Sequence, residues 1–524
     1  MNRATRVLVL GLDSCDKDLV ATWIKEGCLP NFNRLMEQGL VGEISNAHGF
    51  EAGSAMPNFY YGAWPDSHGQ YDGLRRFDPD TYEYREHRVN EIPVDPIWLA
   101  LAKQGKRCFT IDTPYTHLPQ HSNCTAILNW GSHVGASTRP VTNPPELQEE
   151  VVRMFGTDPL GGVMCDYHRP RRAKELLWFR DRLLERIEIR KAMTAHYMAN
   201  AEWDLFLSVF SEAHCAGHHG WHLHDANHLE HDPQVAAEVG DLMKDIYIGL
   251  DGAIGQLVES CSRDTTVIIY LSHGMGIGYS GTRLLDRVLQ RLENGSPRVA
   301  MGDKAIILAR KTWAGAWRLA PKPVKAAMDP LRKKAHKNLY NQGFLPHREK
   351  RRYFEVFVND RSSGIRINLA GRERYGIIQP GKEYEAVCAY LKDELTKVRK
   401  GDTGEPAFLE IVQTNKEYSG ELVKDMPDLV ATWNRETPLN LVTSPTIGEV
   451  KHQLLTVRTG DHRPDGLFVA LGTSVPSARM NKKVPVIDFA PTLASLVGAD
   501  PESFSGRPIP TLCSALGPLE EVDF

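Results

Sequence analysis

Four short apolar runs, each ending at a polar or histidine-rich turn, constrain the fold of this 524-residue chain most strongly. They are residues 6–10 (RVLVL), 107–111 (RCFTI), 205–210 (LFLSVF) and 266–271 (TVIIYL). Runs of this length and composition predict strands that are buried on both faces of a parallel sheet. Helix-permissive stretches such as residues 171–200 separate them. The chain is therefore predicted to be an α/β protein with a doubly wound, mostly parallel sheet.

Metal-capable side chains directly follow three of these runs. Asp13 follows the first run, His214 and His218 follow the third, and His273 follows the fourth. Ligands of open α/β sheets bind beyond the carboxyl ends of the strands, so these side chains are expected to meet at one edge. His462 lies in a further glycine-flanked turn, just before the apolar run LFVALG.

The types and spacing of these residues predict a metal centre. His214 and His218 are four residues apart, so on a helix both imidazoles face one side and can share a cation. The alternative is a solvent-exposed polar loop in which the histidines are incidental. With Asp13, His273 and His462 they form a nitrogen and oxygen ligand set suited to zinc, manganese or iron. We expect one or two divalent cations per chain, with zinc as the first choice. Two ions a few ångströms apart would hold both the attacking and the leaving oxygen of a displacement at phosphorus.

The length of the chain exceeds what one hydrophobic core usually organises. The α/β pattern is interrupted at residues 281–353, where eight Lys or Arg lie between Arg332 and Arg352. We expect an inserted basic cap at 281–353 and an α/β core made of residues 1–280 and 354–524. The basic run is either a solvated helix face or a surface that attracts an anionic substrate or a membrane.

Charge and cysteine usage exclude several classes of protein. The net charge of −4 gives no bias toward nucleic acid. The nine scattered cysteines form no CxxC pair, so neither a disulfide framework nor a cysteine zinc site is expected. The first apolar run is too short for a signal peptide, and no apolar segment is long enough to cross a membrane. We expect a cytoplasmic protein without a transmembrane segment. The sequence leaves the oligomeric state open, with a homo-oligomer as one alternative.

Several segments resemble, in the same order, the type I phosphodiesterase/nucleotide pyrophosphatase branch of the alkaline-phosphatase superfamily. VLVLGLDSCD is similar to the opening strand of that family with its metal-binding aspartate. The family turn G-x-x-P-x-x-H-G and its P-x-T-x-P loop resemble residues 62–73 and 111–119, and later family segments resemble residues 459–472 and 487–498. The resemblance spans most of the chain except the expected cap and part of residues 120–200. It implies a sheet of the alkaline-phosphatase type.

The resemblance also implies how two metal ions would divide the ligands. His218 and His462 match ligands of one site, with His214 at the position of its third ligand. Asp13 and His273 match ligands of the other site, which Ser272 and the nearby but unmatched Ser54 would complete. Two positions depart from the family: His214 stands where an aspartate is usual, and Ser272 replaces the aspartate of an Asp-His pair. The first change keeps a ligand but removes a charge, and the second weakens the other site.

The nucleophile of the family is a Thr or Ser that precedes a Pro at the start of a helix. In GFEAGSAMPNF this position falls on Ala52 or Gly53 without a gap, and on Ala55 with a one-turn deletion. Ser54 is the nearest hydroxyl and is therefore the predicted nucleophile. A helix N-terminus would stabilise both its alkoxide and a bound phosphate. The alternative is that Ser54 is only a helix N-cap.

The sequence thus predicts a metal-dependent hydrolase of phosphate esters, a phosphodiesterase or nucleotide pyrophosphatase in which Ser54 attacks phosphorus in line. Its substrate would be a small phosphate ester or a nucleotide-like molecule. The segment lacks the C-x-P-x-R pattern of sulfatases, which argues against that branch. One alternative is a one-metal variant that catalyses transfer or a different hydrolysis. Another is a degenerate, non-catalytic binding module.

Overall fold

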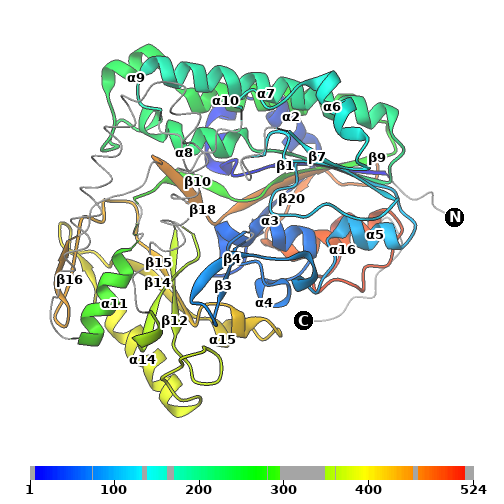
Figure 1. Cartoon of the computed structure of the whole chain (residues 1–524). Coiled ribbons are helices and arrows are strands. Elements are labelled where there is room, and N and C mark those ends of the chain that lie inside the picture. The colour runs from blue at the N-terminus through cyan, green and yellow to red at the C-terminus, as the bar shows by residue number, and fades with distance from the viewer. Residues whose placement is uncertain are drawn as a thin grey trace, which may run out of the picture.

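A large, mostly parallel sheet forms the centre of the protein (Figure 1). The computed structural model describes residues 6–73, 75–132, 139–161, 170–279, 281, 283–294, 348–359, 361–451 and 458–513. Ten strands of this described part form the sheet in the order β20-β2-β19-β9-β1-β8-β5-β6-β7, with β21 beside β2. Their bounds are β1 Arg6–Leu12, β2 Leu40–Ser45, β5 Cys108–Ile111, β6 Cys124–Leu128, β7 Val141–Asn143, β8 Leu205–Phe210, β9 Thr265–Leu271, β19 Gly466–Leu471, β20 Ala478–Arg479 and β21 Val484–Pro485.

The four apolar runs are the strands β1, β5, β8 and β9 at the centre of the sheet. β9, β1, β8, β5 and β6 run parallel, with Val9 opposite both Leu207 and Ile268. β19 and β7 run antiparallel to their neighbours. The prediction of a doubly wound, mostly parallel α/β sheet is confirmed.

Helices cover both faces of the sheet, because alternate residues of each buried strand point to opposite sides (Figure 1). Leu8, Leu10 and Leu12 of β1 pack on one face, and Val7 and Val9 pack on the other. The first face carries α1 Lys17–Lys25, α2 Pro30–Gln38, α6 Leu147–Phe155, α7 Ala173–Asn200, α8 Glu212–His224, α9 Pro233–Val239 and α10 Leu242–Glu259. The second face carries α3 Glu51–Tyr61, α5 Ile97–Lys103, α16 Phe489–Leu496 and α17 Pro510–Cys513. Helix α4 Pro65–His68 contacts α3.

A second lobe has its own core beside the sheet (Figure 1). Its antiparallel sheet has the order β11-β12-β15-β14 and packs against α11 and α14. The bounds are α11 Leu284–Asn294, β11 Tyr353–Phe357, β12 Ser362–Ile367, α14 Lys382–Thr396, β13 Arg399–Lys400, β14 Phe408–Gln413, α15 Thr414–Glu417, β15 Leu429–Trp433, β16 Leu441–Ser444 and β17 Gly448–Lys451.

Two short ribbons and four 3₁₀ turns complete the described elements. The ribbons pair β3 Arg75–Asp78 with β4 Glu83–Glu86, and β10 Gly274–Ile277 with β18 Gly460–Arg463. The turns are η1 Val89–Glu91, η2 Arg348–Lys350, η3 Val423–Asp425 and η4 Val486–Asp488.

The expected division into a core (1–280 and 354–524) and a basic cap (281–353) stays a prediction. Most of that cap, residues 295–347, lies outside the described residues. Its first part is α11, whose buried leucines belong to the core of the second lobe. No helix in the described ranges is long and apolar enough to span a membrane.

Candidate metal centre

The first component of the site is the turn after β1. Asp13 continues the strand, because its backbone N–H donates to the carbonyl of Phe210 at the end of β8 (2.9 Å). The chain then turns through Ser14, which has φ 55°, in the left-handed region that non-glycine residues seldom adopt. Asp16 accepts backbone hydrogen bonds from Asp18 and Leu19 and so caps α1. The turn therefore holds the Asp13 and Ser14 side chains at the carboxyl edge of the sheet.

The second component is helix α8, which begins two residues after β8. His214 and His218 lie one turn apart on it, with ring centroids 4.5 Å apart, and both are buried. The prediction that both imidazoles lie on one side of a helix is confirmed. The alternative prediction, a solvent-exposed loop, is wrong, because both residues are buried on α8. Buried Glu212 in the first turn receives a 2.8 Å hydrogen bond from Arg186 of α7, which fixes the start of the helix.

The third component is the β10–β18 ribbon. His273 directly precedes β10, and His462 lies in β18 opposite Met275. His273 Nε2 and His462 Nδ1 lie 3.0 Å apart. The ribbon thus joins two histidines that are 189 residues apart in the chain.

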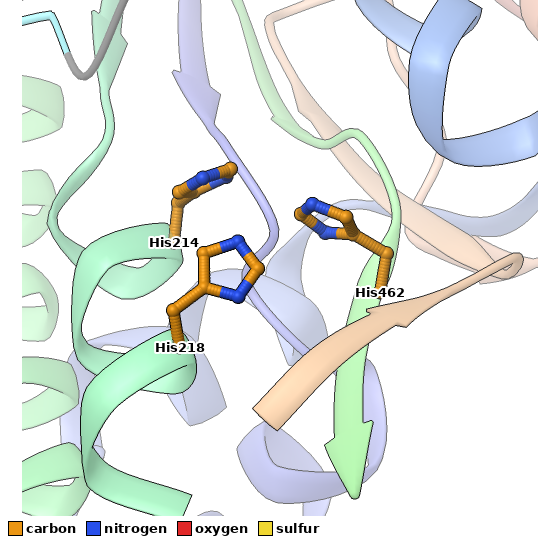
Figure 2. A group of neighbouring side chains, drawn as sticks. All are labelled: His214, His218 and His462. Carbon is orange, nitrogen blue, oxygen red and sulfur yellow. The ribbon is translucent and has the colours of Figure 1, made fainter. Parts of the chain in front are cut away.

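These elements bring the predicted ligands together. Figure 2 shows the rings of His214 and His218, from α8, facing the ring of His462. One ligand atom from each of these three side chains lies within 4.8 Å of the others. Asp13 Oδ2 lies 3.3 Å from His214 Nδ1, which places the carboxylate at the same centre.

The donor set fits a metal ion. The Nδ1–H of His218 donates to the carbonyl oxygen of Gly460 (2.8 Å), so Nε2 presents its lone pair. This Nε2 is buried, and within the described residues it has no hydrogen-bond partner. An imidazole nitrogen in that state is the normal condition of a zinc ligand whose other nitrogen is oriented by a carbonyl.

Burial keeps the imidazoles of His218, His273 and His462 neutral. Burial, reinforced by nearby positive groups, lowers the pKa of His218 and of His462 well below the ordinary 6.5. Burial also lowers the pKa of His273 to about 4, although the Asp13 carboxylate opposes this. Neutral imidazole is the form that binds metal, so the site is ready to bind a cation at neutral pH.

Ser272 contacts two of the predicted ligands. Its hydroxyl lies 2.9 Å from His273 Nδ1 and donates to Asp13 Oδ1 (3.3 Å). The serine that replaces the family aspartate therefore orients His273 and Asp13. A direct role of Ser272 as a ligand stays a prediction.

Ser14 belongs to the same cluster and was missed by the sequence reasoning. Its hydroxyl lies 3.0 Å from both His214 Nδ1 and His273 Nε2, and 3.3 Å from His462 Nδ1. The signal in the sequence was its place directly after Asp13 at a strand end. That signal was weak, because adjacent side chains normally diverge at such a position.

Ser54 is the fourth residue of α3 and is completely buried. Its hydroxyl donates to the carbonyl of Phe50 (2.9 Å) and accepts from Asn58 Nδ2 (3.0 Å). The alternative that Ser54 is an N-cap is wrong, because Phe50 occupies that position. Its role as nucleophile, and as a ligand, stays a prediction.

Two glycines allow α8 to approach the β10–β18 ribbon closely. A Cβ on Gly460 would lie 2.3 Å from the carbonyl oxygen of Gly217, and one on Gly217 would lie 2.4 Å from Met275 Cγ. The approach brings the backbone N–H of Thr459 within 2.7 Å of the carbonyl of His218. The missing side chains thus let the helix that carries His218 lie close to the ribbon that carries His462.

An arginine of the second lobe supports the same ribbon. Arg435 Nη1 pairs with Asp461 Oδ2 at 2.6 Å, and Nη2 donates to the carbonyl oxygen of His462 at 2.8 Å. Asp461 Oδ1 in turn accepts from the backbone N–H of His462 (2.8 Å). The second lobe therefore helps to orient His462.

The fold and site define an α/β protein with a buried histidine cluster, suited to a metal ion, at the carboxyl edge of a parallel sheet. A model of the type I phosphodiesterase/nucleotide pyrophosphatase family matches residues 7–439. The chain belongs to this family, which confirms the resemblance found in the sequence. Membership supports a phosphoester hydrolase of the phosphodiesterase or pyrophosphatase type.

Comparison with solved structures gave distant similarities. Phosphonoacetate hydrolase from Sinorhizobium meliloti 1021, in complex with phosphonoformate, is 11% identical with a TM-score of 0.47, covering 95% of this chain and 96% of that one. Murine ectonucleotide pyrophosphatase/phosphodiesterase 5 is 12% identical with a TM-score of 0.47, covering 96% and 97%. An inactive form of the murine protein, in complex with AMP, gives a TM-score of 0.46 at 12% identity, covering 96% and 97%. No curated protein sequence matched the chain.

Proposed function

We propose that the protein is a metal-dependent phosphodiesterase that acts on a small phosphate ester or nucleotide-like substrate. The observation that carries this proposal is the convergence of His214, His218 and His462, with the lone pair of His218 Nε2 facing the cluster. Family membership supplies the reaction class.

Three imidazoles whose ligand atoms lie within 4.8 Å of one another favour zinc, with manganese or iron as alternatives. A divalent cation held there would stabilise the charge that develops on phosphoryl oxygens during displacement. His218 would be oriented by Gly460, and His462 by Asp461 and Arg435. The metal content of the purified protein, measured by mass spectrometry, tests the identity of the ion.

We further propose that Ser54 attacks phosphorus in line and displaces the leaving oxygen, and that water then hydrolyses the phosphoseryl ester. Support comes from its place near the start of α3, a helix that packs against β18. The hydroxyl must leave the carbonyl of Phe50 to reach a substrate. Ser54→Ala tests this step: full turnover, or mass spectra without a phosphoserine in trapped wild-type enzyme, would exclude it.

The main experiment measures hydrolysis of bis-nitrophenyl phosphate. We expect activity in the wild type that is lost in His218→Ala and after treatment with EDTA, and restored by zinc only in the wild type. His196→Ala is the matched control, because His196 lies on α7 and contacts Phe155 and Tyr197. Full activity of His218→Ala or of the EDTA-treated wild type would refute metal dependence.

A second candidate keeps the fold and uses one cation for transfer or for a different hydrolysis. The 3.0 Å contact between His273 Nε2 and His462 Nδ1 favours it, because these nitrogens would otherwise serve different ions. The 2.9 Å contact between Ser272 Oγ and His273 Nδ1 also favours it, since a serine stands where the family has a charged ligand. One tightly bound ion per chain supports this candidate, and two support the first.

A location in the cytoplasm is also proposed. Its support is the state of the cysteines: the eight that lie in the described ranges all have free thiols. Free thiols are typical of proteins in a reducing compartment. Fractionation of the cells that make the protein tests this location.

A further inference from the structure

The hydroxyl of Ser14 contacts ligand atoms from four separate segments of the chain. Ser14 Oγ lies 3.0 Å from His214 Nδ1, 3.0 Å from His273 Nε2 and 3.3 Å from His462 Nδ1. It also lies 3.4 Å from Asp13 Oδ1. Ser14 itself has no exposed surface. A hydroxyl donates one hydrogen bond and accepts two, so hydrogen bonding accounts for at most three of these four contacts and leaves one to be explained.

These separations match the edges of a coordination shell. Ligand atoms about 2.1 Å from one ion lie about 3.0 Å apart at right angles and about 3.4 Å apart at the tetrahedral angle. The contacts of Ser14 Oγ span this range, and His273 Nε2 to His462 Nδ1 is a further edge of 3.0 Å. Ser14 Oγ therefore lies where one more ligand of a shared ion would lie.

The backbone at Ser14 supports a special role for its side chain. A non-glycine residue at φ 55° is held in the left-handed region, which strains the backbone of any residue with a Cβ. Glycine would avoid this strain but would bring no hydroxyl. The conformation is held by the backbone N–H of Ser14, which donates to Ser272 Oγ (3.3 Å). The strained turn aims the Ser14 hydroxyl at the histidines.

We propose that Ser14 Oγ is an oxygen ligand of the single cation held by the histidine cluster, which the hydroxyl contacts at His214, His273 and His462, beside the Asp13 carboxylate. This assignment rests on the metal dependence proposed above and specifies its one-cation form. It also explains how the site tolerates Ser272 in place of a carboxylate, because Ser14 supplies the oxygen that Ser272 no longer offers to the ion.

The first test replaces the oxygen with sulfur. Ser14→Cys is loaded with Co²⁺, because a thiolate bound to cobalt gives a charge-transfer absorption in the near ultraviolet. We expect this absorption in Ser14→Cys and, relative to the wild-type cobalt protein, no new absorption in the control Ser208→Cys. Ser208 is equally buried, but its hydroxyl is bonded to Thr194. A cobalt-loaded Ser14→Cys without the new absorption overturns the proposal.

The second test measures zinc affinity by calorimetry, which does not depend on activity. Ser14→Ala is expected to bind zinc at least about 10–100-fold more weakly than the wild type, since outer partners alone have effects of this size. Ser14→Gly removes the backbone strain and should bind equally weakly while remaining well folded. Thermal unfolding of the metal-free variants checks that they fold.

The outcomes separate this proposal from the one it rests on. A wild type that binds no zinc or cobalt overturns the metal-dependent function and the role of Ser14 together. A wild type that binds zinc, with Ser14→Gly binding it equally tightly, overturns only the role of Ser14. Weak binding by both Ser14 variants, together with normal folding, supports it.

Discussion

Gly460→Ala tests the close approach of α8 to β18, on which the geometry of the metal centre depends. The new Cβ would lie 2.3 Å from the carbonyl oxygen of Gly217, a backbone atom that cannot rotate away. Cβ atoms essentially never come within 3.0 Å of such an atom, so the two backbones must separate by at least about 0.7 Å. That shift would stretch the 2.7 Å bond from Thr459 N–H to the carbonyl of His218 beyond good hydrogen-bond length.

The expected loss of stability combines two effects. Overpacking costs about 1–3 kcal/mol, and each weakened hydrogen bond costs about 0.5–1.5 kcal/mol. We therefore expect the free energy of unfolding of the metal-free protein to fall by about 2–4 kcal/mol. Zinc affinity should fall by about 10–100-fold, because Gly460 O accepts the hydrogen bond that orients His218.

Urea unfolding and zinc calorimetry measure these two quantities. Gly252→Ala is the control, because a Cβ at this position in α10 has no heavy atom within 4 Å. The control should keep zinc affinity and gain up to about 1 kcal/mol, as an alanine in a helix does. If Gly460→Ala unfolds at the wild-type urea concentration and binds zinc as tightly, the close approach does not set the geometry of the site.

Three other predictions concern buried polar groups. Arg435→Leu leaves the buried carboxylate of Asp461 without its ion-pair partner. Zinc affinity, measured by calorimetry, and stability, measured by urea unfolding, should therefore both fall. Unchanged zinc affinity would contradict the role of Arg435 in orienting His462. Arg186 and Glu212 form a buried ion pair at 2.8 Å, so Arg186→Met should lower the free energy of unfolding by about 3–5 kcal/mol. Adding Glu212→Met removes the unpaired carboxylate and should recover much of this loss. A double variant no more stable than Arg186→Met would contradict this account of the pair. Burial lowers the pKa of His68 from 6.5 to about 3, so the unfolded state takes up the proton first. Stability of the metal-free protein should therefore fall from pH 6.5 toward pH 3, and His68→Gln should make this fall shallower; identical slopes would show that His68 does not contribute.

The fold and most of the metal centre follow from local patterns in the sequence. Each central strand is a short apolar run because a strand covered on both faces has no solvent-exposed side. The four-residue spacing of His214 and His218 determines that both lie on one side of α8, whatever packs around the helix. The predicted position of Asp13 required only that β1 end at the carboxyl edge of the sheet, where its neighbours end.

Only the tertiary structure decided which groups touch at the centre of the site. The contact between His273 and His462 depends on the pairing of β10 with β18, which join segments far apart in the chain. The position of Ser14 depends on its left-handed backbone conformation, which turns the hydroxyl toward the histidine cluster. Likewise, the bonds of the Ser54 hydroxyl within α3 could not be inferred from an alignment that left its register open. Periodicity determines which side of its own element a residue faces, but distances between segments arise only when those elements pack together.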